Sequence, residues 1–164
     1  KFKVGDTVKV VVLRDGKETE INCKIHEEDG RKLFGVALQV AKKYETNPKV
    51  DIKFKSTESG PSGGLMTTLE IYNRLVKKDI TKGLRIAGTG TVDANGNVGI
   101  IGGVRYKLMG ADAGGADVFL VPKGENYKEA MKVKKEKKLD IKVIGVSTVS
   151  EAIESLNKLE SSNV

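Results

Sequence analysis

The Gly-Pro-Ser-Gly-Gly segment at residues 60–64 offers a nucleophile. Ser62 follows a rigid proline and stands beside two residues without side chains, so its hydroxyl is accessible to a carbonyl carbon. Apolar residues recur at steps of four, three and four over residues 62–78, which predicts a helix that begins at this serine. N–H groups at a helix N-terminus stabilise an oxyanion, and because Pro61 has none, the candidate donors are Gly60, Ser62 and Gly63. The same residues also fit a turn in which Ser62 only caps the helix.

A serine nucleophile needs a base, and histidine does not suit this role here. The one histidine, His26, lies in an acidic stretch at residues 26–30 that is typical of a solvated loop. A lysine can serve when burial keeps it neutral, by lowering its pKa from the usual value of about 10.4. Lys107 is the plausible base, because it lies beside Leu108 and Met109 in a short predicted helix rich in small and apolar residues. Most other lysines lie among further charges, which keep an ammonium ion solvated.

Composition limits what else the chain can be. Its 164 residues suffice for one well-packed domain with room for a partial second element. Hydrophobic residues make up 38% and charged residues 31%, which is typical of a soluble globular protein, and no apolar run approaches the roughly 20 residues that span a bilayer. The single cysteine, Cys23, excludes an internal disulfide, and one cysteine with one histidine cannot form a structural zinc site. We therefore predict neither a metal nor a cofactor.

A formal net charge of +7 raises the question of a nucleic-acid partner. Aromatic residues make up only 5% of the chain and none is interleaved with the main basic run, so a platform on which bases could stack is absent. A helix would spread that run around a solvated surface. We predict no nucleic-acid partner and keep nucleic-acid binding as the weakest alternative. The basic run consists of Lys128, Lys132, Lys134, Lys135, Lys137 and Lys138.

The remaining pattern predicts strands and helices that alternate along the chain. Residues 4–25 predict a hairpin that turns at Asp15-Gly16, and residues 26–31 predict a linker. Thr148 to Glu151 fits a capping box, which predicts a last helix through residue 159. The other predicted strands cover residues 34–40, 50–54, 84–92, 98–101, 118–121 and 141–146, and the other predicted helices cover residues 62–78, 104–113 and 125–138.

Two segments together resemble the proteolytic domain of Lon-type proteases. Gly-Pro-Ser-small-Gly is followed by Gly-Gly-x-x-x-Lys, with 45 residues (107 minus 62) from the serine to the lysine, and the resemblance runs from about Phe34 to Val164. It implies an α+β fold of mixed sheets with packed helices. It also implies that Ser62 is the nucleophile, Lys107 the general base and Thr89 a residue that helps to hold the lysine. The family often has an acidic residue two positions before the proline, where this chain has Ser59, with Glu58 one step earlier.

Residues 4–25 resemble the closing strands of a PDZ domain, in which Gly-Asp-x-Val precedes a β-hairpin. With the Lon-like segment, they resemble bacterial PDZ-containing Lon-like proteases, which have an N-terminal membrane anchor and act without ATP outside the cytoplasm. We expect residues 1–30 to be a PDZ remnant plus linker and residues 31–164 to be the proteolytic domain. The chain begins without Met or a leader, so we expect a soluble piece of a longer protein held at the extracytoplasmic face of a bacterial membrane.

These expectations combine into a serine endopeptidase that cleaves unfolded or flexible protein segments through an acyl-enzyme. The chain contains no Gly-x-x-x-x-Gly-Lys-Ser/Thr phosphate loop, so we expect cleavage without ATP. An amidase or a self-cleaving protein would use the same two residues. A protein-interaction module in which they are intact but unused is the alternative from another class. The resemblance also implies a homo-oligomer such as a hexameric ring, although the residues themselves leave the number of subunits open.

Overall fold

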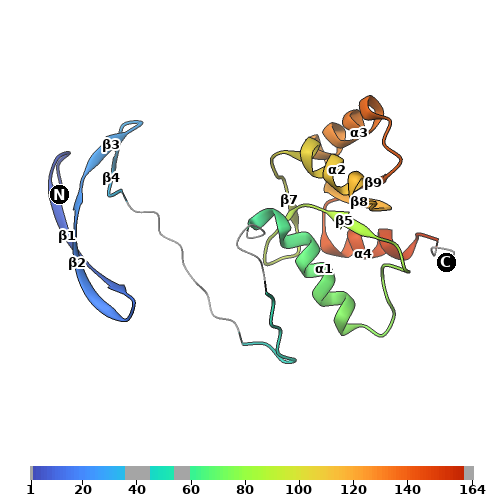
Figure 1. Cartoon of the computed structure of the whole chain (residues 1–164), viewed down its shortest axis with the longest axis horizontal. Helices are drawn as coiled ribbons and strands as arrows, with labels where there is room; N and C mark the ends of the chain where they lie inside the picture. Colours follow the sequence, from blue (N-terminus) through green and yellow to red (C-terminus); the bar gives the residue numbers. More distant parts are fainter. Residues whose placement is uncertain (1, 36–44, 54–59, 161–164) are drawn as a thin grey trace. The chain divides into compact units, whose positions relative to one another are not determined.

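The computed structural model describes residues 2–35, 45–53 and 60–160 (Figure 1). The chain forms two compact units, Lys1–Asn47 and Pro48–Val164. The expected boundary between a PDZ remnant and a proteolytic domain, at residue 30, falls inside the first unit and stays a prediction. Glu58 and Ser59, and residues 36–40 of a predicted strand, lie outside the described residues.

The first unit contains the predicted hairpin, which the structure confirms. Strands β1 (Thr7–Arg14) and β2 (Lys17–Lys24) pair antiparallel. Asp15 and Gly16 connect them with φ of 52° and 76°, the left-handed conformation that a two-residue hairpin turn requires. Val8 faces Cys23 and Val10 faces Ile21 across the ladder, so the alternation in the sequence produces one half-buried apolar face.

The predicted linker at residues 26–31 was wrong, because this segment forms a second hairpin. Strands β3 (His26–Glu28) and β4 (Arg31–Leu33) pair around Asp29 and Gly30, whose φ values are 50° and 71°. Asp-Gly is the same turn signal that closes the first hairpin. The flanking residues are charged and the strands are only three residues long, so no apolar alternation marks them in the sequence.

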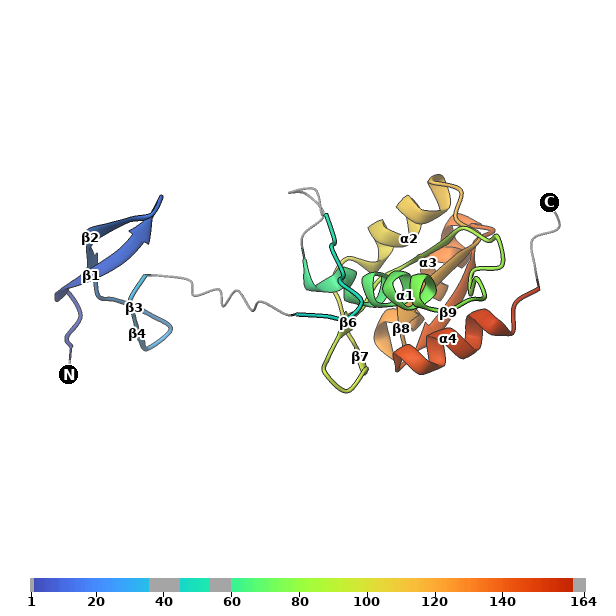
Figure 2. The ribbon, with the colours of Figure 1, turned by 90° about the horizontal axis from the view of Figure 1, so that it is seen from below.

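The second unit is built on a parallel sheet in the order β5-β8-β9, with helices on both faces (Figure 2). The strands are β5 (Ile86–Gly88), β8 (Val118–Pro122) and β9 (Lys142–Val146). All five residues of β8 are buried. Val118 and Leu120 pack with α1 and α4, whereas Phe119 and Val121 pack with α2 and α3. Because neighbouring residues of a strand point to opposite faces, this one strand serves both cores.

The helices agree with the sequence within a few residues. The segment α2 (Val104–Ala113) matches its predicted bounds, and α3 (Glu125–Lys137) and α4 (Val149–Asn157) end one and two residues early. The segment α1 (Gly64–Leu75) follows a 3₁₀ helix, Pro61–Gly63, so Ser62 precedes the α-helix instead of opening it. None of the helices in the described ranges is both long and apolar enough to cross a bilayer.

The predicted strands around the site are only partly formed. The expected strand at residues 84–92 is divided into β5 and β6 (Thr91–Val92), and β6 pairs with β7 (Val98–Gly99). The described residues 50–53 belong to no strand, so that prediction was wrong for them, and Phe54 lies outside the described residues.

The capping box at the start of α4 is present in a modified form. Thr148 Oγ1 accepts a hydrogen bond of 3.0 Å from the Glu151 N–H, as predicted. The Glu151 carboxylate accepts from the Ser147 N–H at 2.8 Å and pairs with Lys123. The hydrogen bond from Lys123 and that from the Ser147 backbone hold the pKa of Glu151 below its usual value. The two side chains thus secure the turn that leads from β9 into α4.

We predict that Thr148→Ala lowers the free energy of unfolding by about 1 kcal/mol, because the Glu151 N–H loses its acceptor. Chemical denaturation at neutral pH measures the change. Ser150→Ala is the matched control, since Ser150 is exposed in the same helical turn, and we expect a change within about 0.5 kcal/mol. Equal effects of the two substitutions would show that the cap does not stabilise the fold.

Candidate active site

Ser62 is held in place through its own backbone carbonyl. The Gly90 N–H donates to the Ser62 carbonyl oxygen at 2.9 Å, and Thr89 Oγ1 donates to the same oxygen at 3.1 Å. One turn later, the Leu65 N–H donates to the Gly90 carbonyl at 3.0 Å. The connection from β5 to β6 is therefore bonded both to the 3₁₀ helix, at Ser62, and to the first turn of α1, at Leu65. This clamp fixes the position of the serine backbone while its half-buried side chain remains available.

Two glycines allow the clamp to form. A Cβ atom at Gly90 would lie 2.7 Å from Val98 Cγ1 and 3.4 Å from Leu65 Cβ, so the Val98 side chain would have to shift. A Cβ atom at Gly64 would lie 3.2 Å from the Val92 backbone nitrogen. At Gly64 the two backbones approach this closely because no side chain stands between them.

Lys107 reaches Ser62 from helix α2. Its Nζ donates to Ser62 Oγ at 3.5 Å, so the structure brings together the two residues that the sequence pairs. Val104 and Leu108 on the same helix are fully buried and attach it to the core. The distance is at the outer limit of a hydrogen bond.

The surroundings of Lys107 differ from the expectation that Leu108 and Met109 bury it. Lys107 is exposed, and Met109 is 36% exposed. Consecutive residues of a helix point in different directions, so Leu108 enters the core while Lys107 points away from it. Apolar neighbours in the sequence therefore do not become apolar neighbours in space.

Thr89 is one of two polar residues that are buried in the described part of the chain, at 2% exposure. Its N–H donates to the Leu120 carbonyl at 2.9 Å, which ties it to the central strand β8. Its hydroxyl was expected to help to hold Lys107. Within the described ranges, the acceptor of that hydroxyl is the Ser62 carbonyl, so Thr89 acts directly on the backbone of the serine.

The three candidate oxyanion donors are not equivalent. The Gly63 N–H donates to the Gly60 carbonyl at 3.1 Å, so the 3₁₀ turn already uses it. For the Ser62 N–H, the part of the chain that the structure describes offers no acceptor within bonding distance. Gly60 adjoins residues outside the described ranges. The sequence alone did not distinguish these groups, because a turn bond between residues 60 and 63 is a property of the backbone conformation.

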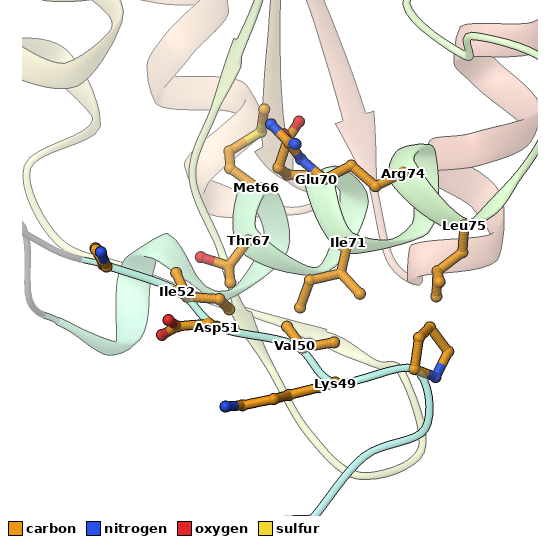
Figure 3. Close-up of a pocket in the computed structure, with 12 residues that line it drawn as sticks. Lys49, Val50, Asp51, Ile52, Met66, Thr67, Glu70, Ile71, Arg74 and Leu75 are labelled. Carbon is orange, nitrogen blue, oxygen red and sulfur yellow. The ribbon is translucent and has the colours of Figure 1, made fainter.

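A groove runs along helix α1, and nothing in the sequence analysis indicated it (Figure 3). The segment 48–53 forms one wall and α1 the other, and together they enclose 770 Å³. Val50, Ile52 and Ile71 line it with apolar surface, and polar groups from Asp51 and Thr67 lie among them. The groove therefore lies beside the helix that Ser62 precedes, although Ser62 is not among its lining residues.

Comparison with known proteins assigns the chain first to the serine-type peptidases. Residues 39–158 match the Lon protease (S16) C-terminal proteolytic domain, and the chain belongs to this family. It is 36% identical over 98 residues to the Lon protease of Neorickettsia sennetsu, which covers 60% of this chain and 12% of that protein. It is 28% identical over 149 residues to the Lon protease of Campylobacter concisus, which covers 89% of this chain and 18% of that protein. The chain thus spans less than a fifth of the length of either relative.

We predict that Thr89→Val lowers kcat by roughly five- to tenfold without unfolding the domain. The substitution keeps the branched shape and removes one hydrogen bond to the Ser62 carbonyl, which is worth about 1 kcal/mol. Thr89→Ser should have a milder effect, because it keeps the hydroxyl. A fluorogenic-peptide assay and a thermal melt measure both quantities.

Thr81→Val is the control for this prediction, because Thr81 bonds the Asp79 carboxylate beyond the far end of α1. We expect it to leave kcat unchanged. An unchanged kcat in Thr89→Val as well would remove Thr89 from the site.

Proposed function

We propose that this chain is a serine endopeptidase in which Ser62 is the nucleophile and Lys107 the general base. The observation that carries the proposal is the 3.5 Å contact between Lys107 Nζ and Ser62 Oγ, which joins residues 45 positions apart. Family membership supports the same reaction class. The clamp on the Ser62 carbonyl supports it further, because a nucleophile must be held in a fixed position before it attacks.

In this mechanism, Ser62 Oγ attacks the carbonyl carbon of the scissile peptide bond while Lys107 Nζ accepts the hydroxyl proton. The tetrahedral intermediate collapses to an acyl-enzyme, and Lys107 returns the proton to the leaving amine. Water then attacks the ester with Lys107 again as base, which releases the second product and restores Ser62. The Ser62 N–H is the first candidate to stabilise the oxyanion, and Gly60 is the second.

In this proposal, a bound substrate must change two features of the site, which are the distance between Ser62 and Lys107 and the exposure of Lys107. Proton transfer needs a contact of about 2.6–3.2 Å, so the serine and the lysine must approach each other from 3.5 Å. Lys107 is exposed, and a peptide that lies over it would displace water from around the amine. The alternative is an interaction module in which Ser62 and Lys107 are unused. The long distance between the two residues and the exposure of Lys107 favour this alternative. Activity measurements distinguish the two.

The N-terminal unit supports a further part of the proposal, that residues 1–30 close a PDZ domain. Val11 and Leu13 are 56% and 75% exposed on one face of the β1–β2 hairpin, while Val8, Val10 and Val12 line the other. Glu20 and Glu18 face Val11 and Leu13 across the ladder, so one face is mixed and the other is apolar, and a two-stranded ribbon with an apolar face needs further chain to cover it. We propose that this chain continues into a PDZ domain and a membrane anchor at the extracytoplasmic face, and that the protein assembles as a homo-oligomer.

We predict that Ser62→Ala, Lys107→Ala and Lys107→Arg each lower the hydrolysis of a fluorogenic peptide and of casein by more than about 100-fold. Arginine keeps the positive charge but cannot become a neutral base. Lys107→Arg therefore shows whether Lys107 acts as a base or only through its charge. Lys128→Arg is the control, because Lys128 is exposed and pairs with Glu125 on the surface of α3. Activity in Lys107→Arg would show that Lys107 is not the general base. Equal activity of wild type and Ser62→Ala would overturn the proposal that this chain is a serine peptidase.

We also predict that ATP with magnesium leaves the rate of casein cleavage by this chain unchanged, because its sequence contains no phosphate loop. Only extended or flexible segments are then accessible to the site. Restoring a complete PDZ domain should change which proteins are cut and leave cleavage of a short peptide nearly the same. If short-peptide cleavage is lost as well, the PDZ domain is a gate on the active site and not a selector of substrates.

A further inference from the structure

Asn126 is a buried polar side chain that the proposed mechanism does not use. It is 7% exposed and lies in the first turn of α3. Its Oδ1 accepts from the Ile101 N–H at 2.9 Å, and its Nδ2 donates to the Ile101 carbonyl at 2.9 Å. Both polar atoms of the amide are therefore paired with the backbone of a single residue 25 positions away. A buried amide that makes two such bonds has one fixed orientation.

These two bonds replace a strand partner where the sheet ends. The pairing of β7 with β6 extends only through Val98 and Gly99, and Ile101 lies two residues beyond it. The Asn126 amide presents a donor and an acceptor side by side, as a residue of a neighbouring strand does. Ile101 is thereby attached to α3.

The attachment point is close to the start of the helix that carries the base. Only Gly102 and Gly103 separate Ile101 from α2, and neither has a side chain that could hold the chain. Gly103 has a φ of 72° and provides no side-chain cap for the helix. The Lys107 N–H donates to the Gly103 carbonyl at 3.2 Å, which makes Lys107 part of the first turn. A shift of Ile101 therefore passes directly to Lys107.

Other contacts hold α2 less specifically at this end. The ion pair of Arg105 with Glu136 spans 3.1 Å, but its side chains are 40% and 42% exposed, and surface pairs of this kind contribute little. Val104 and Leu108 bury the inner face of the helix, and apolar contacts permit small sliding motions that directed hydrogen bonds do not. The Asn126 bonds are thus a buried directional restraint on the chain that leads into α2.

We propose that Asn126 is a positioning residue for the catalytic reaction, because it holds Ile101 and thereby sets the distance from Lys107 Nζ to Ser62 Oγ. The inference rests on the proposed function of these two residues. Asn126 does not touch them, so its loss should reduce kcat and leave KM nearly unchanged. A displacement of about 1 Å between reacting groups is enough to cost up to 100-fold in rate.

The experiment compares Asn126→Ala and Asn126→Asp with a matched control, Asn73→Ala. Asn73 Oδ1 accepts from the Ile80 N–H at 2.8 Å, so it too holds a backbone group, but in the loop that follows α1. Two readouts are used: kcat and KM for a short fluorogenic peptide, and hydrogen exchange of the amides of residues 101–107. Exchange reports on the start of α2 whether or not the chain is a peptidase.

For Asn126→Ala we expect kcat to fall by about 10- to 100-fold, KM to stay within about twofold, and exchange at residues 101–107 to become faster. Asn126→Asp keeps the size of the side chain and removes the Nδ2 donor, so it carries the test if the alanine variant does not fold. Its kcat relative to wild type should fall further as pH rises from mildly acidic values, because the ionised carboxylate then faces the Ile101 carbonyl. Asn73→Ala should lose thermal stability and keep kcat.

The inference is overturned if the folded Asn126 variants keep kcat within about twofold of Asn73→Ala, or if exchange at residues 101–107 is unchanged. A fall in kcat with no change in exchange also contradicts it, because the effect would not pass through α2. If wild type and Ser62→Ala have the same rate, the proposed function fails and the catalytic role of Asn126 fails with it. Faster exchange in Asn126→Ala would then still show that this side chain holds α2.

Discussion

The hydrogen bonds between Ser62, Leu65 and Gly90 are the interaction on which the rest of the site depends. They bond the start of α1 to the end of β5, two segments that are more than 20 residues apart. A side chain at Gly90 would meet the side chains of Val98 and Leu65, and one at Gly64 would press on the Val92 backbone nitrogen. The glycines thus make the clamp possible, and the clamp removes the freedom that glycines would otherwise give to the serine segment.

The central strand β8 explains how α1 and α2, which lie in different layers, both contribute to the site. Leu120 belongs to the core that α1 covers, and Phe119 belongs to the core that α2 covers. The two helices therefore lie on opposite faces of the sheet, and both contact the edge strand β5. Ser62, just before α1, and Lys107, on α2, meet beyond the end of that strand. The carboxyl ends of parallel strands are where α/β sheets commonly place their sites.

The two sides of the site are held by different physical means. The serine backbone is fixed by two hydrogen bonds to its carbonyl oxygen, one from the Gly90 N–H and one from the hydroxyl of Thr89, which is itself tied to β8. The lysine is fixed at its Cα by a buried helix face, while its long side chain is exposed. In the proposed mechanism, a rigid Ser62 and a movable Lys107 side chain can approach each other when a substrate displaces water from the lysine. The 3.5 Å separation is consistent with this arrangement.

Local sequence determined most of the elements, because their signals act over a few residues. The Asp15-Gly16 turn, the cap by Thr148 and the bounds of α2 were all predictable, and so was the pairing of Ser62 with Lys107 once the two segments were read together. Tertiary structure decided which groups meet. The partner of the Thr89 hydroxyl, the exposure of Lys107 and the bonds of Asn126 to Ile101 all join segments through space. Spacing along the chain predicts the direction of a side chain within its own element, but only packing between elements decides what that side chain touches.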